Sequence, residues 1–173
     1  MKTLSPSVRH PSNDDGDTAL DDRMDARVFD IDPLGAEARI LPHLMTAQLQ
    51  STASFLFSYQ SLQSASSCDF PETSCTHDDI LRAQSLLLAK QATTLRDVLR
   101  IDDIYAHPLI RRDSILSGHR IRSFAGAPLR GPQEQLIGVI CTVDTTARWW
   151  TDRDIRIVRR IVAQFEARRL SQP

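Results

Sequence analysis

Two cysteines and a histidine in the first half of the chain are the side chains best suited to chemistry. Cys68 and Cys75 flank the segment DFPETS, and His77 follows two residues after the second thiol. Thiolate and imidazole are zinc ligands, but this spacing does not match a standard finger and no fourth ligand is marked. The pair could instead be redox-active, or the thiols could be ordinary reduced cysteines. We predict no metal site and keep the redox pair as an alternative.

Other catalytic patterns are missing from the sequence. It holds no glycine-rich phosphate loop, no Gly-x-Ser-x-Gly and no His-Glu-x-x-His. The third cysteine, Cys141, lies in an apolar run and is predicted to be a buried small hydrophobe. The basic stretch near the C-terminus lacks interleaved aromatic residues, which argues against nucleic acid as a partner. We therefore predict a protein without a cofactor, and we favour a non-catalytic one.

The composition is that of an ordinary globular protein. Of 173 residues, 41% are hydrophobic and 25% are charged, and the net charge is -1, so no global charge favours nucleic acid or an anionic membrane. No apolar run approaches the roughly 20 residues that span a bilayer, and the N-terminus lacks the apolar core of a signal peptide. Three cysteines are too few for a disulfide scaffold. These features predict a cytoplasmic protein that does not enter a membrane.

The N-terminal segment differs in composition from the rest of the chain. Eight Asp stand between Asp14 and Asp32, among Ser, Pro and Asn. Such a segment buries too little apolar surface to offset the entropy lost on ordering. We predict a disordered acidic tail over residues 1–30 and one folded domain over residues 31–173.

The elements that must position any site follow from periodicity and from capping signals. A first helix begins near Asp32-Pro33 and is kinked or split at Pro42. Strands are expected over 52–60, 93–99, 119–129 and 136–144, with 61–68 as a weak hairpin partner of the first. Further helices begin at Thr76, at Pro108 and at Thr151, where Asp154 completes a near capping box. Because long helices do not strictly alternate with the strands, the order indicates an α+β structure around an antiparallel sheet.

Three stretches resemble conserved motifs of bacterial GAF domains. LRDVLRIDDIYAHPLI (95–110) is similar to the family's strand that ends on Asp, followed by its Asn-Pro-Leu turn. IRSFAGAPLR (121–130) resembles the Phe-Tyr-Ala-Gly-x-Pro-Leu strand, and LIGVICTVDTTARWWTDRDIRIVRRI (136–161) resembles the last strand and closing helix. The resemblance implies a GAF-like central antiparallel β-sheet flanked by helices, with the terminal helices packed on one face.

Most of these motif residues are expected to hold the fold. Gly126 and Gly138 leave room for neighbouring backbone, and Pro128 belongs at a strand edge or bulge. Asp144 and Arg148 are placed to pair across the turn into the last helix.

The resemblance also implies where a ligand would bind. In this family the ligand lies on one face of the sheet, which here would include Phe57, Asp97, Arg122 and Phe124. Bilin-binding members carry a cysteine after the Asn-Pro-Leu turn, but the corresponding RRDSILSGH (111–119) has none, which disfavours a phytochrome-like photoreceptor.

The implied function is signal transduction: a sensor of a small molecule or a protein partner, without an output domain of its own. The alternative that the resemblance leaves open is an enzyme of the free methionine sulfoxide reductase type that uses Cys68 and Cys75.

The last helix also predicts self-association. Its apolar residues fill an arc of about 160°, wider than one sheet contact needs, so the surplus must be buried elsewhere. We expect a homodimer through the first and last helices, with Ile157 at the partner. In the competing arrangement, the helix around Pro42 covers the surplus within one subunit. The apolar residues of the arc are Ile155, Ile157, Val158, Ile161, Val162 and Phe165.

Overall fold

A four-stranded antiparallel sheet forms the centre of the molecule, with the strand order β1-β4-β3-β2. The computed structural model describes residues 34–64, 77–107 and 120–170. The strands are β1 (Ala53–Ser58), β2 (Leu99–Ile101), β3 (Ser123–Arg130) and β4 (Leu136–Asp144). The helices are α1 (Leu41–Leu49), α2 (Tyr59–Ser64), α3 (His77–Ala92) and α4 (Asp152–Leu170), with short 3-10 turns η2 (Ala36–Ile40) and η3 (Ile104–Ala106).

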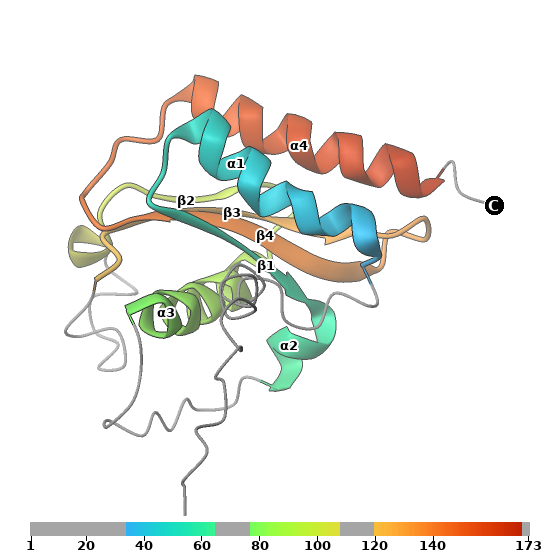
Figure 1. Cartoon of the computed structure of the whole chain (residues 1–173), viewed down its shortest axis with the longest axis horizontal. Coiled ribbons are helices and arrows are strands. Elements are labelled where there is room, and N and C mark those ends of the chain that lie inside the picture. Colours follow the sequence, from blue (N-terminus) through green and yellow to red (C-terminus); the bar gives the residue numbers. More distant parts are fainter. Residues whose placement is uncertain (1–33, 65–76, 108–119, 171–173) are drawn as a thin grey trace, which may run out of the picture.

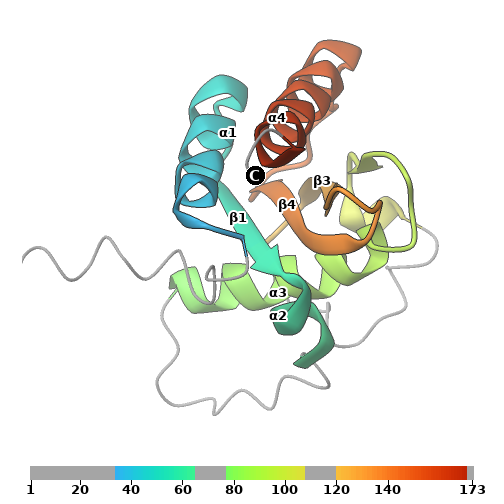
Figure 2. The same ribbon diagram turned by 90° about the vertical axis from the view of Figure 1, so that its right-hand side faces the viewer.

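The helices cover the sheet on both faces. Helices α1 and α4 lie side by side on one face, and α3 and α2 lie on the other (Figures 1 and 2). Two separate apolar cores result, one beneath α1 and α4 and one beneath α3. The predicted α+β class and the packing of both terminal helices on one face are confirmed. No helix in the described part of the chain is long and apolar enough to cross a membrane.

Proline decides how the first helix is built. The 3-10 turn η2 ends at Ile40, and α1 begins at Leu41 with Pro42 in its first turn. Proline is tolerated there because the amide that it lacks would have no partner inside the helix. The predicted split of this segment at Pro42 is therefore confirmed.

The two long strands contain the glycine and proline that the sequence marked. A side chain at Gly138 would meet the carbonyl oxygen of Phe57 at 2.5 Å, so strands β1 and β4 pack too closely there for any Cβ. Pro128 pairs only with β4, because β2 reaches no farther along β3 than Gly126. The absent proline amide therefore breaks no ladder hydrogen bond on the β2 side.

Two expected strands differ from the structure. The expected hairpin partner over 61–68 begins as helix α2, since β1 pairs with the distant strand β4 instead. The expected strand over 93–99 is mostly a turn: Thr93 and Thr94 donate their hydroxyls to carbonyls at the end of α3, and strand β2 starts only at Leu99. Such side-chain bonds to nearby backbone compete with strand formation. The helix expected from Pro108 lies outside the described residues.

The start of α4 matches its predicted cap. The Thr151 hydroxyl accepts a hydrogen bond from the amide of Asp154, while the Asp154 carboxylate accepts from the Thr151 amide. This reciprocal pair satisfies two amides that the helix itself leaves free.

Candidate functional site

The two aromatic residues expected to face a ligand lie together beneath α3. Phe57 and Phe124 are fully buried in the core on that face, and the ring of Phe57 stacks on Phe55 with centroids 6.1 Å apart. The guanidinium of Arg82, on α3, lies 5.7 Å from the centre of the Phe57 ring. Burial lowers the pKa of Arg82, partly opposed by Asp79. The described part of this face is therefore packed by apolar side chains, with one half-buried cation above them.

The cysteines divide between described and undescribed parts of the chain. Cys141 belongs to the same core and is fully buried, as predicted, and burial raises the pKa of its thiol far above the usual range. A thiol held neutral in this way is a poor nucleophile. Cys68 and Cys75, the alternative redox pair, lie outside the described residues. His77 lies exposed at the start of α3 and is hydrogen-bonded to Arg120. Nowhere in the described ranges do three metal-ligating side chains cluster.

Asp97 lies in the segment between α3 and β2 and is paired with the other helical layer. Arg159 of α4 donates from Nε and Nη2 to the two carboxylate oxygens, at 2.8 and 2.5 Å. These hydrogen bonds, with a further one from the amide of Val98, hold the pKa of Asp97 below its usual value. The motif implied that Asp97 ends a strand, but it precedes strand β2, and its ion pair joins this segment to the last helix.

Arg122 forms a separate ion pair at the start of β3. Its Nη2 and Nε donate to Asp103 at 2.9 and 3.2 Å, and its guanidinium lies 4.5 Å from the ring centre of Tyr105. The carboxylate of Asp103 also accepts a hydrogen bond from the backbone amide of Tyr105 and so caps η3. The hydrogen bond from Arg122 lowers the pKa of Asp103, and the carboxylate in turn raises the pKa of Arg122.

The four predicted ligand residues thus occupy three places. The structure brings Phe57 and Phe124 together in the core beneath α3. It places Asp97 beside α4 and Arg122 against Asp103. Their contact with a ligand stays a prediction.

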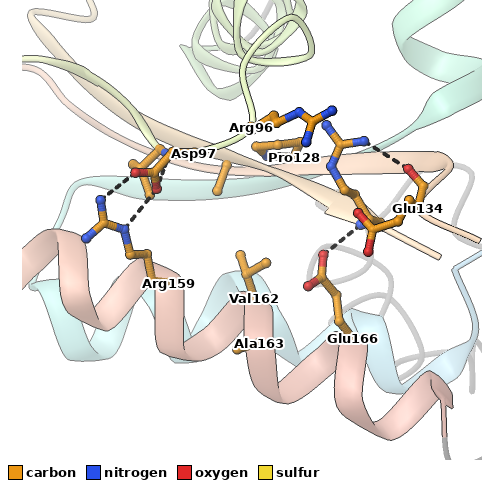
Figure 3. A pocket seen from close by; sticks show the side chains of 11 residues that line it. Arg96, Asp97, Pro128, Glu134, Arg159, Val162, Ala163 and Glu166 are labelled. Carbon is orange, nitrogen blue, oxygen red and sulfur yellow. Dashed lines mark hydrogen bonds and ion pairs between the residues drawn. The ribbon is translucent and has the colours of Figure 1, made fainter. Parts of the chain in front are cut away.

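A groove that the sequence did not mark runs between α4 and the edge of the sheet (Figure 3). It has a volume of about 570 Å³ and is bounded by α4, the segment 96–98 and the end of β3. Its apolar lining is Val98, Ala127, Pro128, Val162 and Ala163. Its charged lining is Arg96, Asp97, Arg130, Glu134, Arg159 and Glu166. No sequence signal could have found it, because its walls come from three segments that lie at least 25 residues apart in the chain.

The edge of β3 inside this groove is closed to a further strand. Pro128 has no amide donor, and the amide of Arg130 donates to Glu166 of α4 at 2.8 Å. The Arg130 side chain donates in turn to the carbonyl of Glu134 at 2.9 Å. Exposed strand edges invite pairing with other chains, and these contacts leave the edge of β3 at Pro128 and Arg130 without a free amide to donate to a further strand.

The predicted pair of Asp144 and Arg148 is confirmed, and it forms the centre of a larger junction. Arg148 donates to Asp144 at 3.0 Å and to the carbonyl of Leu49, at the end of α1, at 2.7 Å. Its guanidinium lies 4.4 Å from the ring centre of the buried Trp150. The carboxylate of Asp102 accepts a hydrogen bond of 2.9 Å from the backbone amide of Trp150. One arginine thus ties the ends of α1 and β4 to the start of α4, which is a structural role.

Comparison with known proteins supports this architecture. The model of the GAF domain family matches residues 46–168. The chain is similar to the third GAF domain of Slr1393 from Synechocystis sp. PCC6803 in its photoproduct state, at 16% identity, covering 80% of this chain and 95% of that one, with a TM-score of 0.54. It is also similar to NpR6012g4, a red/green cyanobacteriochrome in its green light-absorbing state, at 16% identity over 79% and 97% of the two chains, with a TM-score of 0.50.

These likenesses concern the fold alone, since the identities are low. A search of curated proteins finds no significant match. The family model covers 46–168, which includes all four strands, the three stretches that carry the sequence motifs, and nearly the whole of α4. The chain belongs to the GAF domain family.

Proposed function

We propose that this chain is a regulatory domain of signal transduction that acts through protein contacts of its α1–α4 layer, with a second copy of the chain as the partner. The observation that carries this proposal is the apolar outer side of α1. Ile40 and Leu44 are 53% and 39% exposed and stand one turn apart, while Leu41 and Met45 are buried beneath them. Exposed apolar side chains on the outside of a two-helix layer favour a further helical partner.

Within one subunit, α1 covers part of the apolar surface of α4 that does not face the sheet. Ile157 is only half-buried and packs against the core beneath the two helices, and Arg160 donates to Gln48 of α1 at 2.8 Å. This supports a partner surface centred on Ile40 and Leu44 rather than on Ile157. In a two-fold dimer the same patch meets itself, so one substitution changes both sides of the interface.

Light scattering of the whole chain at micromolar concentration tests the proposal. We expect a dimer mass for the wild type and a folded monomer for Leu44→Glu, because a buried unpaired carboxylate is costly at an interface. Gln60→Glu, at an exposed position of α2 on the opposite face of the sheet, is the control that adds the same charge away from this surface, and it should stay dimeric. A monomeric wild type, or a Leu44→Glu variant that still dimerises, would refute the proposed surface.

An activity assay separates the regulatory proposal from the enzymatic alternative. We expect no thiol-dependent reduction of free methionine sulfoxide by the purified chain. Turnover that disappears in Cys68→Ser or Cys75→Ser would replace the regulatory proposal by a redox enzyme.

A further inference from the structure

The outward side of α4 presents a row of arginines. The helix carries six Arg against three acidic residues. Arg153, Arg156 and Arg160 recur every three or four positions and are all exposed, so they lie along one side of the helix. This side is distinct from the buried side, which packs on the sheet.

Several of these charges lack a counter-charge in the described part of the chain. Arg159 is paired with Asp97, and Arg160 donates to the side-chain oxygen Oε1 of Gln48. Arg153 and Arg156 make no hydrogen bond or ion pair with any described residue, and the same holds for Arg96, which lines the groove on the other side of Arg159. We call Arg153 and Arg156, which stand about one turn apart on the outward side of α4, the arginine strip. Uncompensated charges of one sign create a local potential that attracts opposite charge.

The chain itself contains the complementary charge. Residues 14–32 hold eight Asp and two Arg, which leaves a net charge of -6 in that segment. Because the whole chain carries -1, the remaining residues carry +5. The charge of this protein is therefore divided between an acidic segment and a basic remainder.

The path of the chain begins within reach of the strip. The carbonyl of Leu34, the first described residue, accepts a hydrogen bond of 2.8 Å from Arg169 at the C-terminal end of α4. Arg156 lies 13 positions earlier on the same helix, which is about 20 Å at 1.5 Å per residue. An extended chain advances about 3.3 Å per residue, so about six residues bridge this distance. Residues 14–28 can therefore reach the strip, and the short tether gives a high effective concentration.

We propose that the arginine strip is a docking surface for the acidic segment 14–32 of the same chain. Aspartate carboxylates pair with the forked guanidinium groups, each of which donates two parallel hydrogen bonds to a carboxylate. The docked segment covers the outward side of α4 and leaves the outer side of α1 free.

Backbone amide NMR spectra of the whole chain test this proposal. In the double variant Arg153→Gln, Arg156→Gln the amide signals of 14–32 should shift away from their wild-type positions. The control variant Lys90→Gln, Arg120→Gln removes the same charge on the α3 side and should leave those signals unchanged. Raising NaCl from 10 mM to 1 M shortens the screening length from about 30 Å to about 3 Å, so wild-type signals should move to the double-variant positions.

Two results would overturn the proposal. If the signals of 14–32 are the same in the wild type and in the double variant at low salt, the segment does not dock on the strip. If the difference between them vanishes on tenfold dilution, the segment docks on a second copy and not on its own chain. Unchanged signals from β3 and β4 in every sample verify that both variants are folded.

Discussion

Replacing Arg148 by methionine tests whether the junction at the start of α4 holds the two helices to the sheet. The substitution keeps an apolar stem of similar length and removes the guanidinium. It breaks hydrogen bonds of 3.0 Å to Asp144 and 2.7 Å to the carbonyl of Leu49, as well as the contact with Trp150. The side chains of Arg148 and Asp144 are only 24% and 13% exposed, so water replaces these bonds poorly.

The magnitude follows from these contacts. A hydrogen bond to a charged group contributes about 1.5–3 kcal/mol when one partner is removed. Asp144 keeps two hydrogen bonds from Thr52, which limits the penalty on the carboxylate. We therefore expect Arg148→Met to lower the free energy of unfolding by about 2–4 kcal/mol, less than the loss for a fully buried pair.

Urea denaturation followed by circular dichroism measures this loss, and Arg159→Met is the matched control. Arg159 and Asp97 are 55% and 60% exposed, so salt and water screen their ion pair and its loss should hardly change stability. Equal losses in the two variants would refute the argument, since burial of the Arg148 junction would then have no consequence.

Three further predictions concern the sheet, an ion pair and a thiol. Gly138→Ala should destabilise the protein by about 1–3 kcal/mol in urea denaturation, because its Cβ would meet backbone; Gly131→Ala, where only a flexible Gln side chain intrudes, should cost far less. Arg159→Gln should raise the pKa of Asp97 toward its usual value in an NMR pH titration, because the ion pair stabilises the ionised carboxylate. In the wild type the pair is lost only as the pH falls through the lowered pKa of Asp97, and an unchanged pKa in the variant would contradict this. Cys141 should resist iodoacetamide in the native protein and react in urea, as read by mass spectrometry of its peptide, and rapid native labelling would contradict its burial.

Local sequence was sufficient for several elements. The apolar run over 136–144 is strand β4 with the same bounds, and the cap of α4 at Thr151 forms as expected. The split at Pro42 follows from the missing amide alone. These features depend on residues that are neighbours in the chain, so the sequence carries their signals directly.

The family motifs in 95–161 also indicated the layered α+β fold before any contact was known. They pointed to the close approach at Gly138 and to the pairing of Asp144 with Arg148. The pair of Asp144 and Arg148 needs only a strand, a turn and a helix in the correct order, and that order is written along the chain. The motif marked Gly138, but only the pairing of β1 with β4 showed that the carbonyl of Phe57 lies against it.

Tertiary structure decided what the candidate site residues touch. Asp97 meets Arg159, 62 positions away, and the groove beside them needs α4 to lie along the sheet edge. Strand β1 pairs with β4 and not with the segment that follows β1 in the chain. The reason is that strand pairing depends on the apolar surface that whole strands bury. Periodicity shows which side of a helix or strand is apolar, but not which distant segment covers it, since many partners could bury the same surface.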